Sequence, residues 1–197
     1  TGNNNVAVGS SASVNNTTGG QNTVVGVNAK AINATDSYAN VFGYNVEGAA
    51  FYTTVGRDAY DSRLANGGTS WAAVSDQRYK KDIVDSTAGL SFINALQPRT
   101  FNYKTLGELP ETFRAYEADS TKVYKSSQTQ HGFIAQEIKA AIDADSSIAD
   151  GFKLWDDRED GSQEVAEAAL IPVLTKAIQE LSTQLDAALA RITTLEG

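Results

Sequence analysis

The chain of 197 residues contains no cysteine, no methionine and a single histidine. Without cysteine there is no disulfide bond and no thiolate metal site, and one histidine cannot provide a site with several histidine ligands. We therefore expect neither a metal nor another cofactor. The sequence also lacks an apolar run of about 18 residues, so it predicts no membrane-spanning segment.

Basic residues are fewer than acidic ones, 16 against 24, which gives a net charge of -8. Nucleic acid and anionic membrane surfaces would repel such a chain, and we expect neither as a partner. A hydrophobic content of 41% is sufficient for a core, so the chain is not a disordered tail. Because it begins without methionine and without the apolar core of a signal peptide, we expect it to be an excerpt of a longer protein.

The composition changes abruptly near residue 75. Residues 1–74 hold three basic and four acidic residues, 10 of the 16 glycines and none of the three prolines. Residues 75–197 hold 13 basic and 20 acidic residues, and so carry -7 of the net charge of -8. This change predicts two segments, with the boundary at residue 75.

The first segment contains a repeat in which short β-prone runs end in glycine. The first three of these glycines are 17 residues apart and the fourth follows after 13, at Gly9, Gly26, Gly43 and Gly56. A small or β-branched residue follows three positions after each, at Ala12, Ala29, Val46 and Ala59. We predict a β-roll or β-helix with one coil per repeat and the glycines at corners with positive φ or close approach. A flexible Gly/Asn-rich linker is the alternative.

The repeat is similar to the head repeats of trimeric adhesins and to the β-rolls of phage fibres. Its open ends would need to be capped by neighbouring copies or by the following domain.

The second segment predicts alternating helices and strands. Leu90, Ile93 and Leu96 recur at helical spacing, with Ser86 or Thr87 as the cap before them and Pro98 after them. Residues 100–103 predict a strand, and the polar residues 105–130 predict an extended arm or a long hairpin. A second helix is expected after residues 131–133, with an apolar stripe at Ile134, Ile138 and Ile142. Residues 143–162 predict a loop, held to the core by Phe152, Leu154 and Trp155.

The last segment carries an unbroken heptad pattern. Apolar residues alternate at spacings of three and four, at Ile171, Leu174, Ile178, Leu181, Leu185, Ala188, Ile192 and Leu195. This pattern predicts a coiled coil over about 165–196, with a helix that begins or kinks at Pro172. Ile at most a positions and Leu at most d positions favour two strands. An amphipathic membrane helix is disfavoured because the polar face is not basic.

A serine and a lysine lie five residues apart at the boundary, at Ser75 and Lys80. A lysine freed of its proton can accept the proton of a serine hydroxyl, so such a pair can perform acyl chemistry without histidine. On its own the pair is no more than a polar surface turn, because serine and lysine occur at this spacing by chance.

Four blocks occur in order around and after this pair. They are SDQRYKKDI at 75–83, GLSFINALQPRTFNYK at 89–104, HGFIAQEI at 131–138 and ALIPVLTKAIQEL at 169–181. Together they resemble the peptidase S74 family, the C-terminal intramolecular chaperone domain of phage tailspikes, tail fibres and endosialidases. The resemblance covers 75–197. Together with the repeats of 1–74, it gives the expected fold class, α+β: trimeric β-roll or β-helix repeats, then a mixed α/β chaperone domain that ends in a long coiled-coil helix. The resemblance implies three strands for this coiled coil.

The resemblance also implies self-cleavage between Val74 and Ser75. Ser75 would be the nucleophile that attacks the carbonyl of Val74, and Lys80 would be the general base. Burial in a trimer, or a nearby cation such as Arg78 or Lys81, would favour the neutral amine. Lys81 remains an alternative base.

Further residues of the family blocks are candidates for supporting roles. Asp76 and Arg78 would orient the turn, or form a simple surface ion pair. His131, the lone histidine, would assist the cut or be structural. Gln136 and Glu137, in the same block of the sequence, would be buried partners of the turn.

The expected function is therefore an intramolecular chaperone that trimerises, registers an upstream β-rich fibre segment, and releases itself. The N-terminal part would belong to a virion tail fibre or tailspike, and the chaperone would act in the host cytoplasm. A non-cleaving trimerisation tip of a fibre or adhesin is the alternative. The animal myelin regulatory factors carry a similar self-cleaving domain, but the basic patch and membrane span they need are missing from this sequence.

Overall fold

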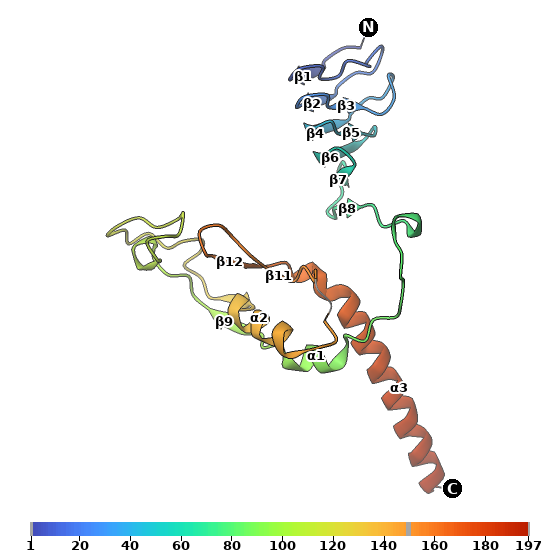
Figure 1. The fold of residues 1–197 in the computed structure, drawn as a ribbon, viewed down its shortest axis with the longest axis vertical. Helices are drawn as coiled ribbons and strands as arrows, with labels where there is room; N and C mark the ends of the chain where they lie inside the picture. Colours follow the sequence, from blue (N-terminus) through green and yellow to red (C-terminus); the bar gives the residue numbers. More distant parts are fainter. Residues whose placement is uncertain (1, 149–150, 197) are drawn as a thin grey trace. The chain divides into compact units, whose positions relative to one another are not determined.

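The computed structural model describes residues 2–148 and 151–196. The chain divides into two compact units, Thr1–Ile83 and Val84–Gly197. Figure 1 follows the elements of both units along the chain. The predicted fold class is confirmed: a β-solenoid comes first, a mixed α/β region follows, and a long helix comes last.

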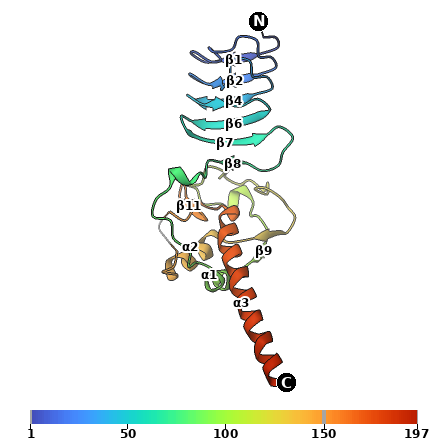
Figure 2. The same cartoon turned by 90° about the vertical axis from the view of Figure 1, so that its right-hand side faces the viewer.

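The first unit is a solenoid of stacked parallel strands (Figure 2). Its main sheet contains β1 (Val6–Val8), β2 (Thr23–Val25), β4 (Asn40–Tyr44) and β6 (Tyr52–Arg57) in parallel, followed by antiparallel β7 (Tyr60–Ala65) and β8 (Ala72–Ala73). On the other side of the coils, β3 (Lys30–Ala31) pairs in parallel with β5 (Glu47–Gly48). Ala7 lies opposite Val24 and Val24 opposite Val41, so the register advances by one repeat per coil. The linker alternative is wrong.

The repeated glycines form tight corners in three of the four positions. Gly9, Gly26 and Gly43 have φ between 128° and 135°, a region that favours glycine. A Cβ on Gly26 would lie 1.8 Å from the carbonyl oxygen of Gly43, so the coils stack too closely for any side chain. Gly56 differs, because it is not among the glycines with positive φ and lies opposite Asp61 of the antiparallel strand β7.

The fourth repeat is therefore not a complete coil. The chain turns back after β6 into a hairpin, and Ala59 lies exposed in that turn, whereas Ala29 and Val46 at the same repeat position are buried. The hairpin and β8 continue the sheet with antiparallel strands beyond the last parallel strand.

At two further corners of each coil, a residue other than glycine adopts left-handed backbone with positive φ. All their φ values lie between 53° and 63°. One series is Asn4, Gln21, Tyr38 and Phe51, and the other is Ser11, Asn28, Asn45 and Asp58. Both series follow the spacing of 17, 17 and 13 residues, so the corners are properties of the coil and not of single residues.

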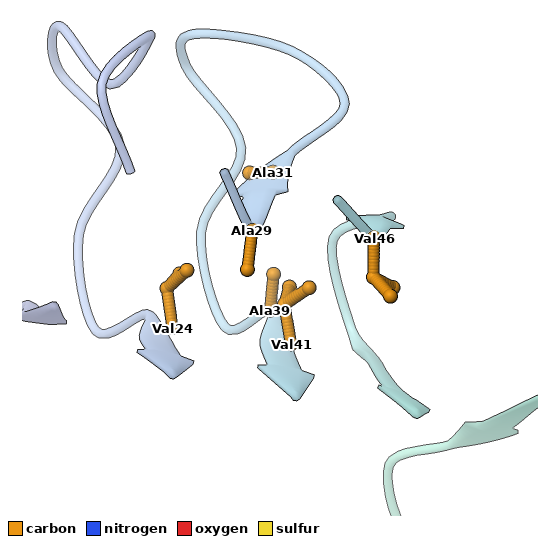
Figure 3. Packing of buried hydrophobic residues seen from close by; sticks show 6 residues of the cluster. All are labelled: Val24, Ala29, Ala31, Ala39, Val41 and Val46. Atoms are coloured by element: carbon orange, nitrogen blue, oxygen red, sulfur yellow. The ribbon is translucent and has the colours of Figure 1, made fainter. Parts of the chain in front are cut away.

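Small side chains fill the solenoid core. Figure 3 shows Val24 and Val41 on the strands facing Ala29 and Val46 on the return side of the coils. Asn22 is buried among them, and its amide bridges two parts of the next coil: Oδ1 accepts from Ala39 N at 2.9 Å and Nδ2 donates to Asp36 O at 2.8 Å. Buried polar groups must be paired, and this side chain pairs both of its ends.

The second unit contains short helices and two-stranded sheets, in which α1 packs against the long helix α3 and α2 packs against α1 and the pair β11–β12. Its elements are α1 (Leu90–Ala95), β9 (Arg99–Phe101), η2 (Leu106–Glu108), β10 (Gln130–Gly132), α2 (Ala135–Ala144), β11 (Trp155–Asp157), β12 (Gln163–Val165), η3 (Glu167–Ala169) and α3 (Leu170–Glu196). β9 pairs with β10 and β11 with β12, both antiparallel. The buried core consists of Ala88, Phe92, Ile138, Leu154, Leu170 and Val173.

Both short helices were predicted, but the expected cap of the first is wrong. The N-cap of α1 is Gly89, not Ser86 or Thr87, and no side chain of the cap residue bonds the helix. The Leu90 N–H instead donates to Glu180 Oε2 of α3 at 2.9 Å. The predicted loop 143–162 is partly wrong as well, because β11 lies within it. Residues 149–150 of this range are outside the described residues.

Residues 105–130 form the predicted hairpin-like arm with little regular strand. Thr105 forms an isolated antiparallel bridge with Val123, and Leu106 N donates to Lys122 O at 2.8 Å. Arg114 N donates to Asp160 Oδ2 at 3.1 Å, which links the arm to the β11–β12 turn. Hydrogen bonds from Ser162 and Arg114 lower the pKa of Asp160 to about 2, so the carboxylate that accepts from Arg114 stays ionised down to acid pH.

The long helix α3 presents two apolar stripes. The inner stripe, Leu170, Val173 and Ala177, is buried within the unit. The predicted heptad residues form the outer stripe, hereafter the seam, and are exposed, with Ile178 65% and Leu185 59% accessible. The helix begins at Leu170, later than the expected 165, because the preceding residues form β12 and η3. Pro172 lies in the first turn, where proline is tolerated.

The close stacking of the coils predicts the effect of a single methyl group. Gly26→Ala should destabilise the solenoid by roughly 3 kcal/mol or more, because it combines left-handed backbone with an overlap on the next coil. Gly67→Ala is the matched control: its φ is +85° and nothing lies within 4 Å of the added Cβ. It should cost only about 1 kcal/mol. Thermal unfolding followed by circular dichroism compares the two, and equal losses would contradict the stacking argument.

Candidate functional site

A short turn follows the last strand of the solenoid. β8 ends at Ala73, and Asp76 then caps the 3-10 helix η1 (Gln77–Tyr79). Asp76 Oδ1 accepts from Arg78 N at 2.8 Å, and Lys80 N donates to Gln77 O at 2.9 Å to close the turn. Aspartate is a favoured cap because its short side chain reaches the free N–H groups of the first turn.

This turn brings Ser75 and Lys80 together. The serine precedes the cap and the lysine follows the helix, so one turn separates them, and Lys80 Nζ lies 2.6 Å from Ser75 Oγ. The ammonium donates to the hydroxyl in this arrangement, and a neutral amine at the same place would accept the hydroxyl proton. Lys81 is also exposed and makes no hydrogen bond or ion pair within residues 2–148 and 151–196.

A bidentate ion pair stiffens the turn. Arg78 Nε and Nη2 donate to the two carboxylate oxygens of Asp76 at 2.9 and 2.7 Å. These hydrogen bonds, together with the one from Arg78 N, lower the pKa of Asp76, and the carboxylate raises the pKa of Arg78. The same aspartate therefore caps the helix and holds the arginine.

The other candidate residues lie in the second unit, whereas the Ser75 turn belongs to the first. His131 is exposed in β10, opposite Thr100 of β9. Gln136 is exposed in the first turn of α2, so the expectation that it is buried is wrong for the single chain. Glu137 pairs with Arg99, whose Nε and Nη2 donate at 3.0 and 2.8 Å, and Arg99 lowers the pKa of this carboxyl group.

The chain around the turn is open to water. Between residues 71 and 87 every side chain except Asp76 is exposed. Large apolar side chains are among them: Val74 is 62% accessible, Tyr79 79% and Ile83 61%. The single chain therefore leaves the serine and the lysine hydrated, beside apolar groups that have no cover.

The sequence analysis did not single out Arg99 or Glu180, although both hold other parts of the second unit in place. Arg99 fixes Glu137 at the start of α2, and Glu180 holds the start of α1. For Arg99 the sequence offers no signal, because its partner lies 38 positions away. For Glu180 a signal exists, since this charged residue stands three positions after Ala177 and so continues the inner apolar stripe.

Neither a metal site nor a membrane helix is found in the described part of the chain. No group of three His, Cys, Asp or Glu side chains lies close enough to hold a metal ion among residues 2–148 and 151–196. Over the same residues, no helix combines the length and the apolar character needed to cross a bilayer.

Comparison with known families identifies the segment that begins at this turn. Residues 75–145 match the model of the peptidase S74 family, described as chaperone of endosialidase. The family assignment is confirmed for residues 75–145, which contain the first three sequence blocks, and the fourth block, at 169–181, lies beyond the matched residues. Domains of this family are autoproteolytic and imply an intramolecular chaperone role. No curated protein and no solved structure matches the chain. The hairpin β11–β12 and α3 lie beyond the matched residues.

The ion pair in the turn predicts a pH response. Because the folded pKa of Asp76 is below its ordinary value of 3.8, its contribution to the turn is present above pH 3.8 and is lost as the pH falls through the lowered value. Carbon-13 NMR of the carboxyl groups should show this low midpoint, and Arg78→Ala should move it back up. The Asp145 carboxyl, whose pKa is lowered by Ser147, is the internal control and should not move. An unchanged Asp76 midpoint would contradict the assignment to Arg78.

Proposed function

We propose that this chain is a self-cleaving intramolecular chaperone that cuts its own Val74–Ser75 bond. The observation that carries the proposal is the 2.6 Å contact between Ser75 Oγ and Lys80 Nζ, in a capped turn directly after the last solenoid strand. The family match, which begins at Ser75, supports it. The two domains of the proposal are the solenoid end, 1–74, and the chaperone, 75–197.

The proposed reaction is a serine-lysine acyl transfer within the chain. Lys80 Nζ accepts the hydroxyl proton while Ser75 Oγ attacks the carbonyl carbon of Val74. The C–N bond breaks, the proton passes from Lys80 to the nitrogen of Ser75, and an ester joins Val74 to Ser75 Oγ. Water then hydrolyses the ester and leaves a carboxylate on Val74 and a free amine on Ser75.

Assembly into a homotrimer is the second part of the proposal. The exposed seam of α3 offers apolar side chains at heptad spacing, which is typical of a coiled coil. Its Ile and Leu pattern on its own favours two strands, whereas the family indicates three. We choose three, because stacked β-coils of fibres close by three-fold symmetry.

In this proposal, assembly favours cleavage because it removes water from the lysine amine. An amine in water is protonated at neutral pH and cannot act as a base, and burial favours its neutral form. Copies of the chain that cover Val74, Tyr79 and Ile83 would also remove water from the serine and the lysine. The cut would then follow assembly and not precede it.

The chaperone would act on the β-rich chain upstream of the turn. Three helices joined along the seam bring three solenoids close together, which lowers the entropic cost of closing their long-range contacts. Release by cleavage would then leave an assembled fibre that cannot unfold along the path by which it formed. We expect such a fibre to belong to a phage tail, and the chaperone to be released in the host cytoplasm.

A non-cleaving trimerisation tip is the second candidate. It is favoured by one observation, the exposure of Ser75 and Lys80 in the single chain. Intact mass measurement of purified protein separates the two functions, since only the chaperone yields fragments 1–74 and 75–197.

Substitutions of the pair should stop the cut. Ser75→Ala removes the nucleophile and should leave the chain full length, and Lys80→Ala should slow cleavage by roughly 100-fold or more, which is a typical loss for a general base. Lys81→Ala, an equal change one residue along, should cut at the wild-type rate. Fragments are followed by mass spectrometry over time. Cleavage in Ser75→Ala would show that the nucleophile is wrong, and loss of cleavage only in Lys81→Ala would move the base to Lys81.

The seam predicts a monomer that does not cut. Ile178→Asp/Leu181→Asp places charges without partners in the coiled coil, which costs several kcal/mol per chain. The variant should be monomeric by light scattering and remain full length although Ser75 and Lys80 are intact. Gln179→Asp/Thr183→Asp adds the same charge outside the seam and should stay trimeric and cut. A monomer that cuts at the wild-type rate would contradict the coupling, and a wild-type dimer would contradict three strands.

A further inference from the structure

The two apolar stripes of α3 are offset by a single residue. The inner stripe contains Leu170, Val173 and Ala177, and the first seam residues, each one position later, are Ile171, Leu174 and Ile178. One residue corresponds to about 100° around a helix. A rotation of α3 by that angle would therefore place the seam against α1 and leave the inner stripe outside. Apolar burial alone does not choose between the two arrangements, because both faces are apolar.

Glu180 distinguishes the two faces. It continues the inner stripe at the next helical position, three residues after Ala177, and its carboxylate accepts from the Leu90 N–H at 2.9 Å. That N–H belongs to the first turn of α1, where backbone donors have no partner within the helix. In the rotated arrangement Leu181 would take this position. A leucine offers no acceptor, so the Leu90 N–H would lose its partner.

The site around this bond is shaped for a carboxylate. Gly89 is buried, and a Cβ added to it would lie 2.7 Å from Glu180 Oε2 and 2.8 Å from Oε1, so a side chain at this position would displace the carboxylate from its present place. Lys176, one turn earlier on α3, has its Nζ 3.7 Å from Glu180 Oε1. The Glu180 side chain is 33% accessible, so it is held at the edge of the contact between α1 and α3.

We propose that Glu180 sets the rotation of α3, so that the inner stripe packs on α1 and the seam is left free for other copies of the chain. Glu180 is then a specificity residue for assembly and not only a helix cap. A single polar contact that selects one of two apolar packings is a known use of partly buried polar groups. The part that concerns other copies rests on the proposed trimer.

The test uses thiol labelling. Because the chain has no cysteine, only the introduced thiol reacts. Each reporter is introduced singly into the full chain carrying Ser75→Ala, to prevent cleavage. Ala177→Cys reports on the inner stripe, where Ala177 is 3% accessible, and Leu154→Cys reports on the core of the unit, where Leu154 is 0% accessible. Glu180→Leu removes the acceptor and extends the apolar stripe, whereas Glu180→Gln keeps an acceptor oxygen.

Glu180→Leu should raise the maleimide labelling rate of the Ala177→Cys thiol at least tenfold and leave the Leu154→Cys thiol protected. Glu180→Gln should change neither by more than about twofold. Protection of the Ala177→Cys thiol in Glu180→Leu would overturn the proposal, and labelling of both thiols would show a loss of folding and assign Glu180 to stability alone. A second variant, Glu180→Ala with Gly89→Ser, supplies a local cap for α1; if it protects the Ala177→Cys thiol again, Glu180 is only a cap and the proposal fails.

Light scattering on the same samples separates this proposal from the proposed function. The Ser75→Ala parent should be trimeric, and Glu180→Leu should lose at least half of its trimer at equal concentration. A monomeric parent would contradict the trimer, while the labelling result would still decide the rotation of α3. A parent and a Glu180→Leu variant that are equally trimeric would overturn the role of Glu180 in assembly.

Discussion

A single chain cannot bury all the apolar surface of α3, and much else in the structure follows from this constraint. The inner stripe is used within the second unit, so the seam is left without cover, with Ile171 63% and Ile178 65% accessible. The Ser75 turn is uncovered in the same way. In the proposed trimer, further copies of the chain would cover both surfaces. The exposure of both surfaces is the physical reason for linking the proposed assembly with the proposed cut at the Val74–Ser75 bond.

The solenoid obeys a different constraint, the spacing between coils. Its core contains mostly alanine and valine, so the apolar area buried by each coil is small. Close contacts between coils offset this small buried area. The corner glycines leave no room for a Cβ, and the Asn22 amide forms hydrogen bonds to two parts of the next coil. Such a stack depends on every coil having nearly the same path, which explains why the same backbone corners recur.

Features governed by local spacing could be predicted from the sequence. The interval between Gly9 and Gly26 indicated the coils, the heptads indicated α3, and the interval between Ser75 and Lys80 fits one capped turn. Features governed by distant partners could not. Glu180 holds Leu90 across 90 positions, and Tyr38 adopts left-handed backbone that an aromatic residue does not signal. The hairpin after β6 was missed because Gly56 ends its run like the other glycines. The chemical role of Ser75 itself remains a prediction.

The strand direction reverses after β6, so the number of parallel coils in the solenoid does not depend on the hairpin that ends it. Because the antiparallel strands β7 and β8 finish the sheet, the parallel coils before them are interchangeable units of 17 residues in a register that repeats from Ala7 to Val24 to Val41. Duplicating one such unit would add a rung without altering the hairpin, the Ser75 turn or α3. A gene encoding this architecture can therefore change the length of the solenoid by whole repeats while the second unit stays the same.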